Sequence, residues 1–142
     1  METLGKTALP RELRVVSMTV GPDAVGRYAE LTADFNPIHL DAEFAAGTIF
    51  GRPIIHGTLG LNLVIEAIER TFGAAPPNLA IDVRFVRPVP VGASVRAGGR
   101  LKDAATGTYE IYVETQVGER AVEGVCSFGP APDDQNHGAH AT

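Results

Sequence analysis

Hydrophobic and polar residues alternate along four segments in the second half of the chain, which is typical of strands with one buried face. The alternation is clearest from Leu79 to Phe85, where every second residue is apolar. Polar, glycine-containing segments at 103–107 and 117–119 favour hairpin turns between the later strands. The strands expected from this pattern are 78–85, 94–101, 108–116 and 120–128.

The first half of the chain carries the predicted helices. Residues 13–20 are rich in β-branched side chains and predict a first strand, whereas residues 23–33 place their apolar positions on one broad helical face. Residues 58–72 are apolar on nearly every side in their first half, and Gly73 follows as a helix end. A helix that is apolar all round is buried. A buried helix followed by antiparallel strands predicts an α+β fold in which the sheet curls around that helix.

A sharp corner is expected where the helix of residues 23–33 ends. Pro37 biases Asn36 toward extended backbone, so the helix should end at or just before Asp34. The helix dipole disfavours a carboxylate at the C-terminal end of a helix. A residue that departs from this local preference is a candidate for a functional role. Asp34 and His39 could meet across the corner as a general acid/base pair around one water. Alternatively, both are ordinary loop residues that bond to nearby backbone, and Asn36 is a turn opener.

A second candidate feature is the start of the long helix. Helix N-termini carry unpaired N–H groups and partial positive charge, and Gly57 lets a ligand approach closely, so its N–H is a candidate oxyanion donor. Water on that N–H is the structural alternative. His56 is expected to cap the helix or to lie in the core, and it is also a candidate substrate-binding residue together with Gly57. Phe50 could line an apolar pocket or simply pack, and Arg52 could contact a ligand phosphate or stay solvated.

Two motifs, D-F-N-P-I-H-L-D and F-G-R-P-I-I-H-G, resemble the signature of the MaoC-like family of (R)-specific enoyl-CoA hydratases. These are enzymes with the hot-dog fold, an antiparallel sheet wrapped around a long central helix. The resemblance extends over about residues 13–128. The residues that stand in the expected order are Asp34, Asn36, Pro37, His39, Asp41, Phe50, Gly51, Pro53, His56 and Gly57.

The resemblance implies a function and a site. It implies reversible hydration of a trans-2-enoyl-CoA to the (R)-3-hydroxyacyl-CoA, with Asp34 and His39 as the catalytic dyad. Asp34 is expected to act as base toward the water, and His39 is expected to supply the proton to the α-carbon. The Gly57 N–H is expected to bind the thioester carbonyl, while Asn36 orients His39 or the water. The family also implies at least a homodimer, with no metal and no cofactor other than the coenzyme A of the substrate.

Three other functions stay open. A hot-dog thioesterase would hydrolyse the acyl-CoA. A 3-hydroxyacyl-thioester dehydratase acting on acyl carrier protein would need a basic patch, which Arg84, Arg87, Arg96 and Arg100 could form. A non-catalytic subunit that binds acyl thioesters belongs to a different functional class, and an intact dyad argues against it.

Composition sets the remaining bounds. The 142 residues fit one domain, expected at 13–129 between an N-terminal arm at 1–12 and a disordered tail at 130–142. A net charge of −5 without a basic run argues against nucleic acid as a partner. The single cysteine, Cys126, excludes an internal disulfide and is expected to be a buried structural thiol. No signal-peptide pattern or membrane-length apolar run is evident, so we expect a cytoplasmic protein without a membrane partner.

Metal sites are not expected. His137 and His140 lie in the polar C-terminal segment without further ligands, which is a weak metal signal. Around the corner, Asp34, His39, Asp41 and His56 are possible ligand types, but their sequence spacing matches no tight metal motif.

Overall fold

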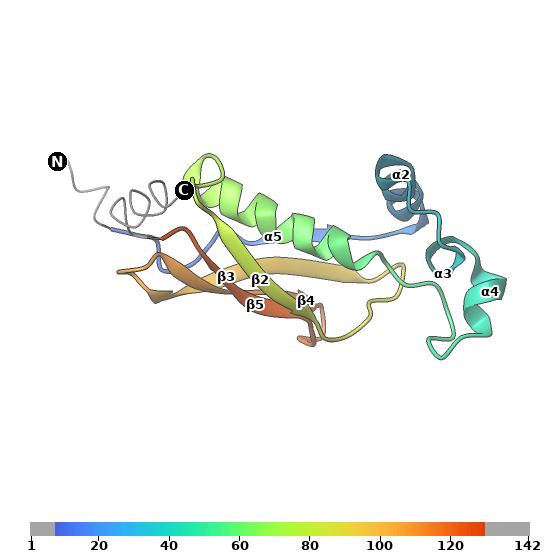
Figure 1. Ribbon diagram of the computed structural model, residues 1–142. Coiled ribbons are helices and arrows are strands. Elements are labelled where there is room, and N and C mark those ends of the chain that lie inside the picture. The colour runs from blue at the N-terminus through green and yellow to red at the C-terminus, as the bar shows by residue number, and fades with distance from the viewer. Residues whose placement is uncertain (1–7, 130–142) are drawn as a thin grey trace, which may run out of the picture.

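The computed structural model describes residues 8–129. Its centre is one five-stranded antiparallel sheet with the order β1-β3-β4-β5-β2, and the long helix α5 packs along one face of that sheet (Figure 1). This arrangement agrees with the predicted α+β hot-dog fold. The strands are β1 Val16–Thr19, β2 Ala80–Phe85, β3 Ser94–Asp103, β4 Thr108–Thr115 and β5 Arg120–Ser127.

Helix α5, Gly57–Phe72, is the element around which the core forms. Its buried residues recur at helical spacing and face the alternate, inward-pointing residues of β3, β4 and β5. Gly73 ends the helix with φ 88°, a left-handed conformation that glycine adopts without steric cost, and its N–H donates to the Glu69 carbonyl. Among the described residues, no helix has the length and apolar character needed to cross a membrane.

The first strand is shorter than the sequence pattern predicts. Residues 16–19 pair with β3, whereas Leu13 and Arg11 make only separate main-chain hydrogen bonds to Gly99 and Leu101. The chain therefore runs along β3 from residue 11 onward without forming a continuous ladder. The other predicted strands are present with ends that differ by one or two residues. The predicted tail, which contains His137 and His140, lies outside the described residues, as does most of the predicted N-terminal arm.

Three short helices project beyond one end of the sheet as a helical extension, residues 22–46 (Figure 1). They are α2 Pro22–Thr32, α3 Pro37–Leu40 and α4 Ala42–Ala46. Asp41 begins α4, because its carboxylate accepts hydrogen bonds from the N–H groups of Glu43 and Phe44. The extension reaches the N-terminal end of α5, so the two candidate features of the sequence meet there.

Candidate active site

Three local features shape the corner that carries Asp34: a left-handed residue and two hydrogen bonds from main-chain N–H groups to side chains. Helix α2 ends at Thr32, the cap residue Ala33 has φ 58°, and the Asp34 N–H then donates to the Ala29 carbonyl. The Asn36 side chain accepts the Ile38 N–H at 3.0 Å and so caps α3. One Asp34 carboxylate oxygen lies 3.3 Å from the main-chain nitrogen of Asn36 and accepts its N–H. The side chain of Asn36 is therefore used to begin the short helix that carries the candidate histidine.

His39 is held from the far side of the corner. Its Nδ1 lies 2.7 Å from the main-chain oxygen of Ile54. A carbonyl can only accept, so Nδ1 carries the hydrogen and Nε2 is the nitrogen left for chemistry. His39 is half-buried, whereas Asp34 is exposed. The pair thus combines a fixed ring with a carboxylate that water can reach.

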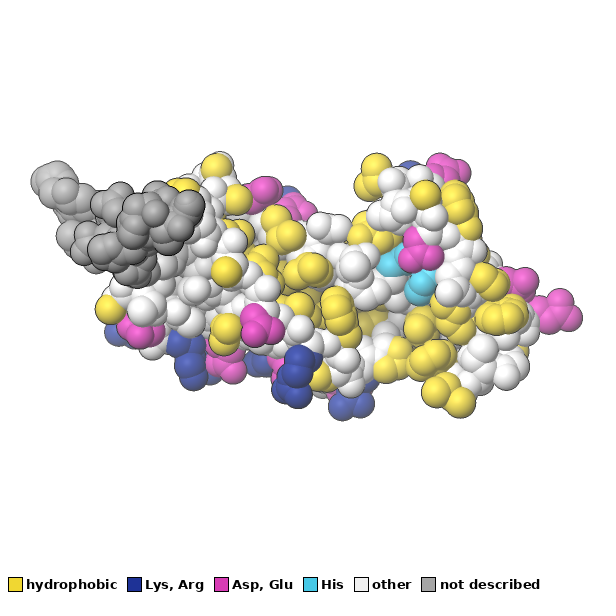
Figure 2. Space-filling view, in the orientation of Figure 1, with side chains coloured by type: hydrophobic (Ala, Val, Ile, Leu, Met, Phe, Trp, Pro, Cys, Tyr) yellow, Lys and Arg dark blue, Asp and Glu magenta, His cyan; other side chains and the backbone are white. Residues whose placement is uncertain are grey.

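The structure brings Asp34, His39 and His56 together. One ligand-type atom of each side chain lies within 4.8 Å of the other two. Two groups that each hydrogen-bond to one shared water stand about 5 Å apart, so this separation suits a bridging water. Figure 2 shows histidine side chains beside an acidic side chain, in the hollow between the helical extension and the body.

The same grouping raises the question of a metal, which the sequence spacing did not suggest. The His39 and His56 rings are stacked, with centroids 3.8 Å apart and an angle of 23° between the planes. A metal ion lies close to the plane of each imidazole that binds it. Two nearly parallel rings at this separation cannot both point a lone pair at one ion. Asp41, the fourth residue considered, points its carboxylate at the start of α4.

His56 precedes α5 and is buried, with 2% of its surface exposed. It occupies the N-cap position, but its side chain makes no capping bond. Its Nε2 instead lies 3.1 Å from the Asp34 main-chain oxygen, and its Nδ1 has no partner among the described residues. Gly57 is the first residue of α5, where N–H groups have no partner within the helix.

An apolar cavity of about 280 Å³ begins at Gly57 and follows α5 toward Gly60. Phe50 lines it, as does Ile54, whose carbonyl holds His39. Arg52 is exposed and does not line it. The remaining lining residues are Ile55, Phe85, Val86, Arg87, Pro88, Val89, Val113, Ala121 and Val122. Most of these come from β2, β4, β5 and the segment after β2, so no local motif could have identified them.

A hydrogen-bonded group next to the dyad also escaped the sequence analysis. The Tyr28 hydroxyl donates to Thr58 Oγ1 at 2.8 Å and accepts from Asn62 Nδ2 at 2.9 Å. The Tyr28 ring meets the His56 ring edge-on, with centroids 5.0 Å apart. Tyr28 and Asn62 are 34 positions apart in the chain, and neither stands in a recognisable motif.

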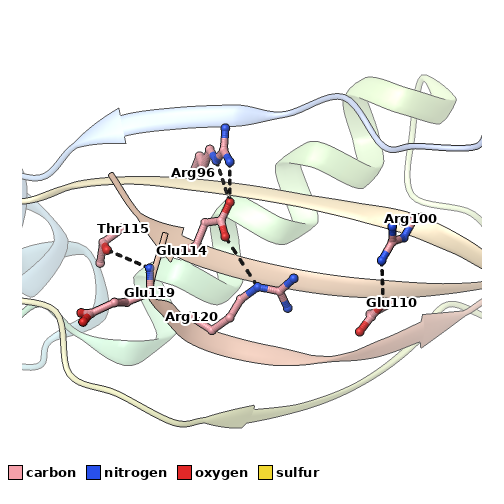
Figure 3. Close-up of polar contacts among 7 residues, drawn as sticks. All are labelled: Arg96, Arg100, Glu110, Glu114, Thr115, Glu119 and Arg120. Carbon is pink, nitrogen blue, oxygen red and sulfur yellow. Dashed lines mark hydrogen bonds and ion pairs between the residues drawn. The ribbon is translucent and has the colours of Figure 1, made fainter. Parts of the chain in front are cut away.

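The four arginines considered as a basic patch lie over β2, β3 and the segment after β2, and each has a carboxylate partner. Figure 3 shows two of these pairs, Arg96 with Glu114 and Arg100 with Glu110, at 2.6 and 3.7 Å. Arg84 and Arg87 pair with Glu123 and Glu119 at 2.8 and 3.9 Å. The Glu114 hydrogen bond raises the pKa of Arg96. The positive charge of these side chains is therefore offset locally.

Residues 6–123 match the family model described as MaoC like domain. The (R)-specific enoyl-CoA hydratase of Aeromonas caviae is 36% identical over 114 residues, which are 77% of this chain and 85% of the relative. The 3-hydroxyacyl-thioester dehydratase Z of Mycobacterium tuberculosis is 36% identical over 108 residues, 70% of this chain and 72% of the relative.

Solved structures agree with the fold. The structure of the (R)-hydratase from A. caviae involved in PHA biosynthesis has a TM-score of 0.74 and 29% identity, and the match covers 92% of this chain and all of that one. The predicted hot-dog fold is thereby confirmed. The relatives named above are hydro-lyases by name. The chain therefore belongs to the MaoC-like domain family, as its two sequence motifs predicted.

Proposed function

We propose that this protein hydrates trans-2-enoyl-CoA reversibly to the (R)-3-hydroxyacyl-CoA. The observation that carries the proposal is the approach of Asp34 and His39 to within 4.8 Å, next to the N-terminus of α5. Water, a proton-transfer pair and an oxyanion donor are the parts that addition of water to an enoyl thioester requires. The names of the A. caviae and M. tuberculosis relatives support the same class of reaction.

In this mechanism the dyad moves one proton from water to carbon. The Asp34 carboxylate takes a proton from the water as its oxygen forms a bond to C3 and the C2–C3 π electrons move toward the thioester. The protonated His39 then gives the hydrogen on Nε2 to C2. A proton passes from Asp34 to His39 to reset the pair, so the atoms and electrons balance without an electron carrier.

The Gly57 N–H stabilises the charge that develops on the thioester oxygen. Removing one such donor in an enzyme typically costs about 3 to 4 kcal/mol of barrier lowering. The acyl chain would enter the apolar cavity, which begins at the same residue. Both new bonds form on the side of the substrate that faces the dyad. Addition therefore takes place on one face and gives a single enantiomer of the product.

Coenzyme A suits this surface better than an acyl carrier protein as the thioester carrier. Each of the four candidate arginines is paired with a glutamate, which lowers the positive charge that this surface would offer to an acidic carrier protein. We therefore place dehydration on an acyl carrier protein second. A parallel assay with the same acyl group on both carriers distinguishes them.

We also infer a homodimer. Among residues 8–129, strand β2 is the last strand of the sheet and pairs with β5 alone. An unpaired strand edge with apolar neighbours needs a cover, and Phe85 and Val86 at its end are exposed. A second copy paired edge to edge through β2 would extend the sheet. Sedimentation equilibrium should give twice the 15.0 kDa mass of one chain, and a single-chain mass would overturn this inference.

The test of the dyad uses crotonyl-CoA and follows loss of the enoyl absorbance. Asp34→Asn and His39→Gln should each remove most turnover while the fold, checked by circular dichroism, persists. Asp41→Asn is the matched control, because it removes a neighbouring carboxylate yet keeps an oxygen for the α4 cap. Near-normal turnover in either dyad variant would refute the assignment. Release of free thiol, detected with a thiol-reactive dye, would favour a thioesterase instead.

A further inference from the structure

His56 is the buried polar side chain of the described core, and its surroundings define its orientation. Its Nε2 faces the Asp34 carbonyl, which can only accept, so Nε2 must carry the hydrogen. Its Nδ1 is then a bare acceptor, and it has no partner among the described residues. The ring is thus held in one tautomer by a bond to the main chain of a dyad residue.

Two other aromatic rings also contact the His56 ring. The His39 ring stacks on it with centroids 3.8 Å apart, and the Tyr28 ring meets it edge-on. Tyr28 is in turn hydrogen-bonded to Thr58 and Asn62 in the first two turns of α5. A continuous set of contacts therefore leads from α5 through Tyr28 and His56 to the catalytic pair.

These contacts matter because the dyad lies on an extension outside the main core. Asp34 and His39 lie on that extension and are exposed and half-buried, whereas Gly57 begins α5, whose inward face belongs to the core. The residue directly before Gly57 touches both dyad residues, one through its N–H and the other through its face. One side chain can thus set the distance from the dyad to the oxyanion donor.

We propose that His56 is a positioning residue that fixes Asp34 and His39 relative to the Gly57 N–H. The inference rests on the proposed hydration reaction. The ring has two separable actions: the Nε2–H holds the Asp34 main chain, and the aromatic face holds the His39 ring. His56 itself exchanges no proton with the substrate.

Three substitutions separate these actions. His56→Gln keeps an amide N–H near the place of Nε2 but removes the face. His56→Asn also removes the face, and its shorter side chain places the amide near Nδ1. His56→Phe keeps the face and removes the donor. Misplacement of a reacting group by about 1 Å can cost on the order of 100-fold in rate. We expect kcat on crotonyl-CoA to fall about 10- to 100-fold in all three, with KM within about twofold of wild type and Gln retaining more activity than Asn.

Unchanged kcat in folded variants would overturn the proposal, as would a loss confined to KM, which would mean that His56 contacts the substrate. NMR of the histidine rings provides a readout independent of turnover. The wild type should show His56 protonated at Nε2, and the His39 ring protons should be shifted upfield by the stacked ring. That shift should disappear in His56→Gln and persist in His56→Phe.

An Nδ1–H tautomer for His56, or no stacking shift on His39, would refute the positioning role even if a variant failed to fold. If the wild type hydrates no enoyl-CoA, the proposed function fails, while the NMR result still decides whether the ring holds the dyad. The two failures are therefore distinguishable.

Discussion

Gly57 and Phe85 both line the apolar cavity, and a methyl group on Gly57 would lie 3.1 Å from the nearest carbon of the phenyl ring. Alanine favours a helix more than glycine does, so Gly57→Ala should keep α5 intact. The phenyl ring would have to move, however, and the approach to the Gly57 N–H would narrow. We expect Gly57→Ala to lower kcat/KM for crotonyl-CoA at least several-fold, as measured by steady-state kinetics.

The double variant Gly57→Ala with Phe85→Leu is the control for this contact. A smaller side chain at position 85 should return much of the lost kcat/KM. Failure of the second substitution to restore activity would show that the methyl group acts through something other than Phe85. Gly57→Pro, which removes the N–H, should reduce turnover more, although proline also alters the start of the helix.

Ala33 is strained by its position at the corner before Asp34. Its φ of 58° is the left-handed conformation, which costs a residue with a Cβ about 1–2 kcal/mol. Glycine avoids that cost but loses more chain entropy on folding, by about 0.5–1 kcal/mol. Ala33→Gly should therefore raise the free energy of unfolding by about 0.5–1 kcal/mol in urea titrations.

Asn78→Gly is the control for Ala33→Gly. Asn78 also has a positive φ, 64°, and asparagine tolerates that conformation better than alanine does. Asn78→Gly should change the free energy of unfolding less than Ala33→Gly does. A lower stability for Ala33→Gly would contradict the strain assigned to the corner.

Tyr109 and Cys126 should make the fold sensitive to alkaline pH. Burial raises the pKa of the Tyr109 phenol above its ordinary value of 10.0, and burial likewise raises the pKa of the Cys126 thiol above 9.0. At a pH between the unfolded and the folded pKa of either group, the folded chain still holds the proton that the unfolded chain has released. Their contribution to the free energy of unfolding is therefore fully present below pH 9 and falls as pH rises through the folded pKa values.

The measurement is urea unfolding at a series of pH values from 7 upward. Wild type should lose stability progressively above pH 9. Tyr109→Phe should be less stable at neutral pH, since it loses the hydrogen bond to the Pro10 carbonyl, but its alkaline decline should be shallower. An equal slope in wild type, Tyr109→Phe and Cys126→Ala would refute the assignment of the alkaline decline to these two groups.

The size of the residue at position 60 is expected to limit the length of the acyl chain that the cavity can hold. A Cβ at this position would make ordinary contacts, at 3.6 Å, with Val113 and Val122 across the cavity. Gly60→Ala should fit, whereas Gly60→Val should fill part of the volume. Each buried methylene contributes about 0.8 kcal/mol, or roughly fourfold in kcat/KM. Gly60→Val should therefore favour crotonyl-CoA over enoyl-CoA substrates with six or eight carbons, and an unchanged preference would place the acyl chain elsewhere.

The local sequence determined most of the elements of this fold and several of their ends. Proline 37, the Asp41 cap, Gly73 and the alternation along β2 act over a few residues, so their effects can be derived without tertiary contacts. The corner at Asp34 was evident for the same reason. The resemblance of two motifs then indicated the family and the dyad, because those motifs are local too.

Tertiary structure alone decided what surrounds the dyad. The Ile54 carbonyl that orients His39, the His56 ring stacked on it and the Tyr28 hydroxyl bonded to α5 come from separate segments. Phe85 and Val122 join the cavity only because the sheet curls around α5. Such contacts depend on which elements pack together, whereas the periodic pattern in the sequence shows only which face of an element is buried. The sequence therefore determined which groups could carry out the chemistry, and the fold decided how those groups are held.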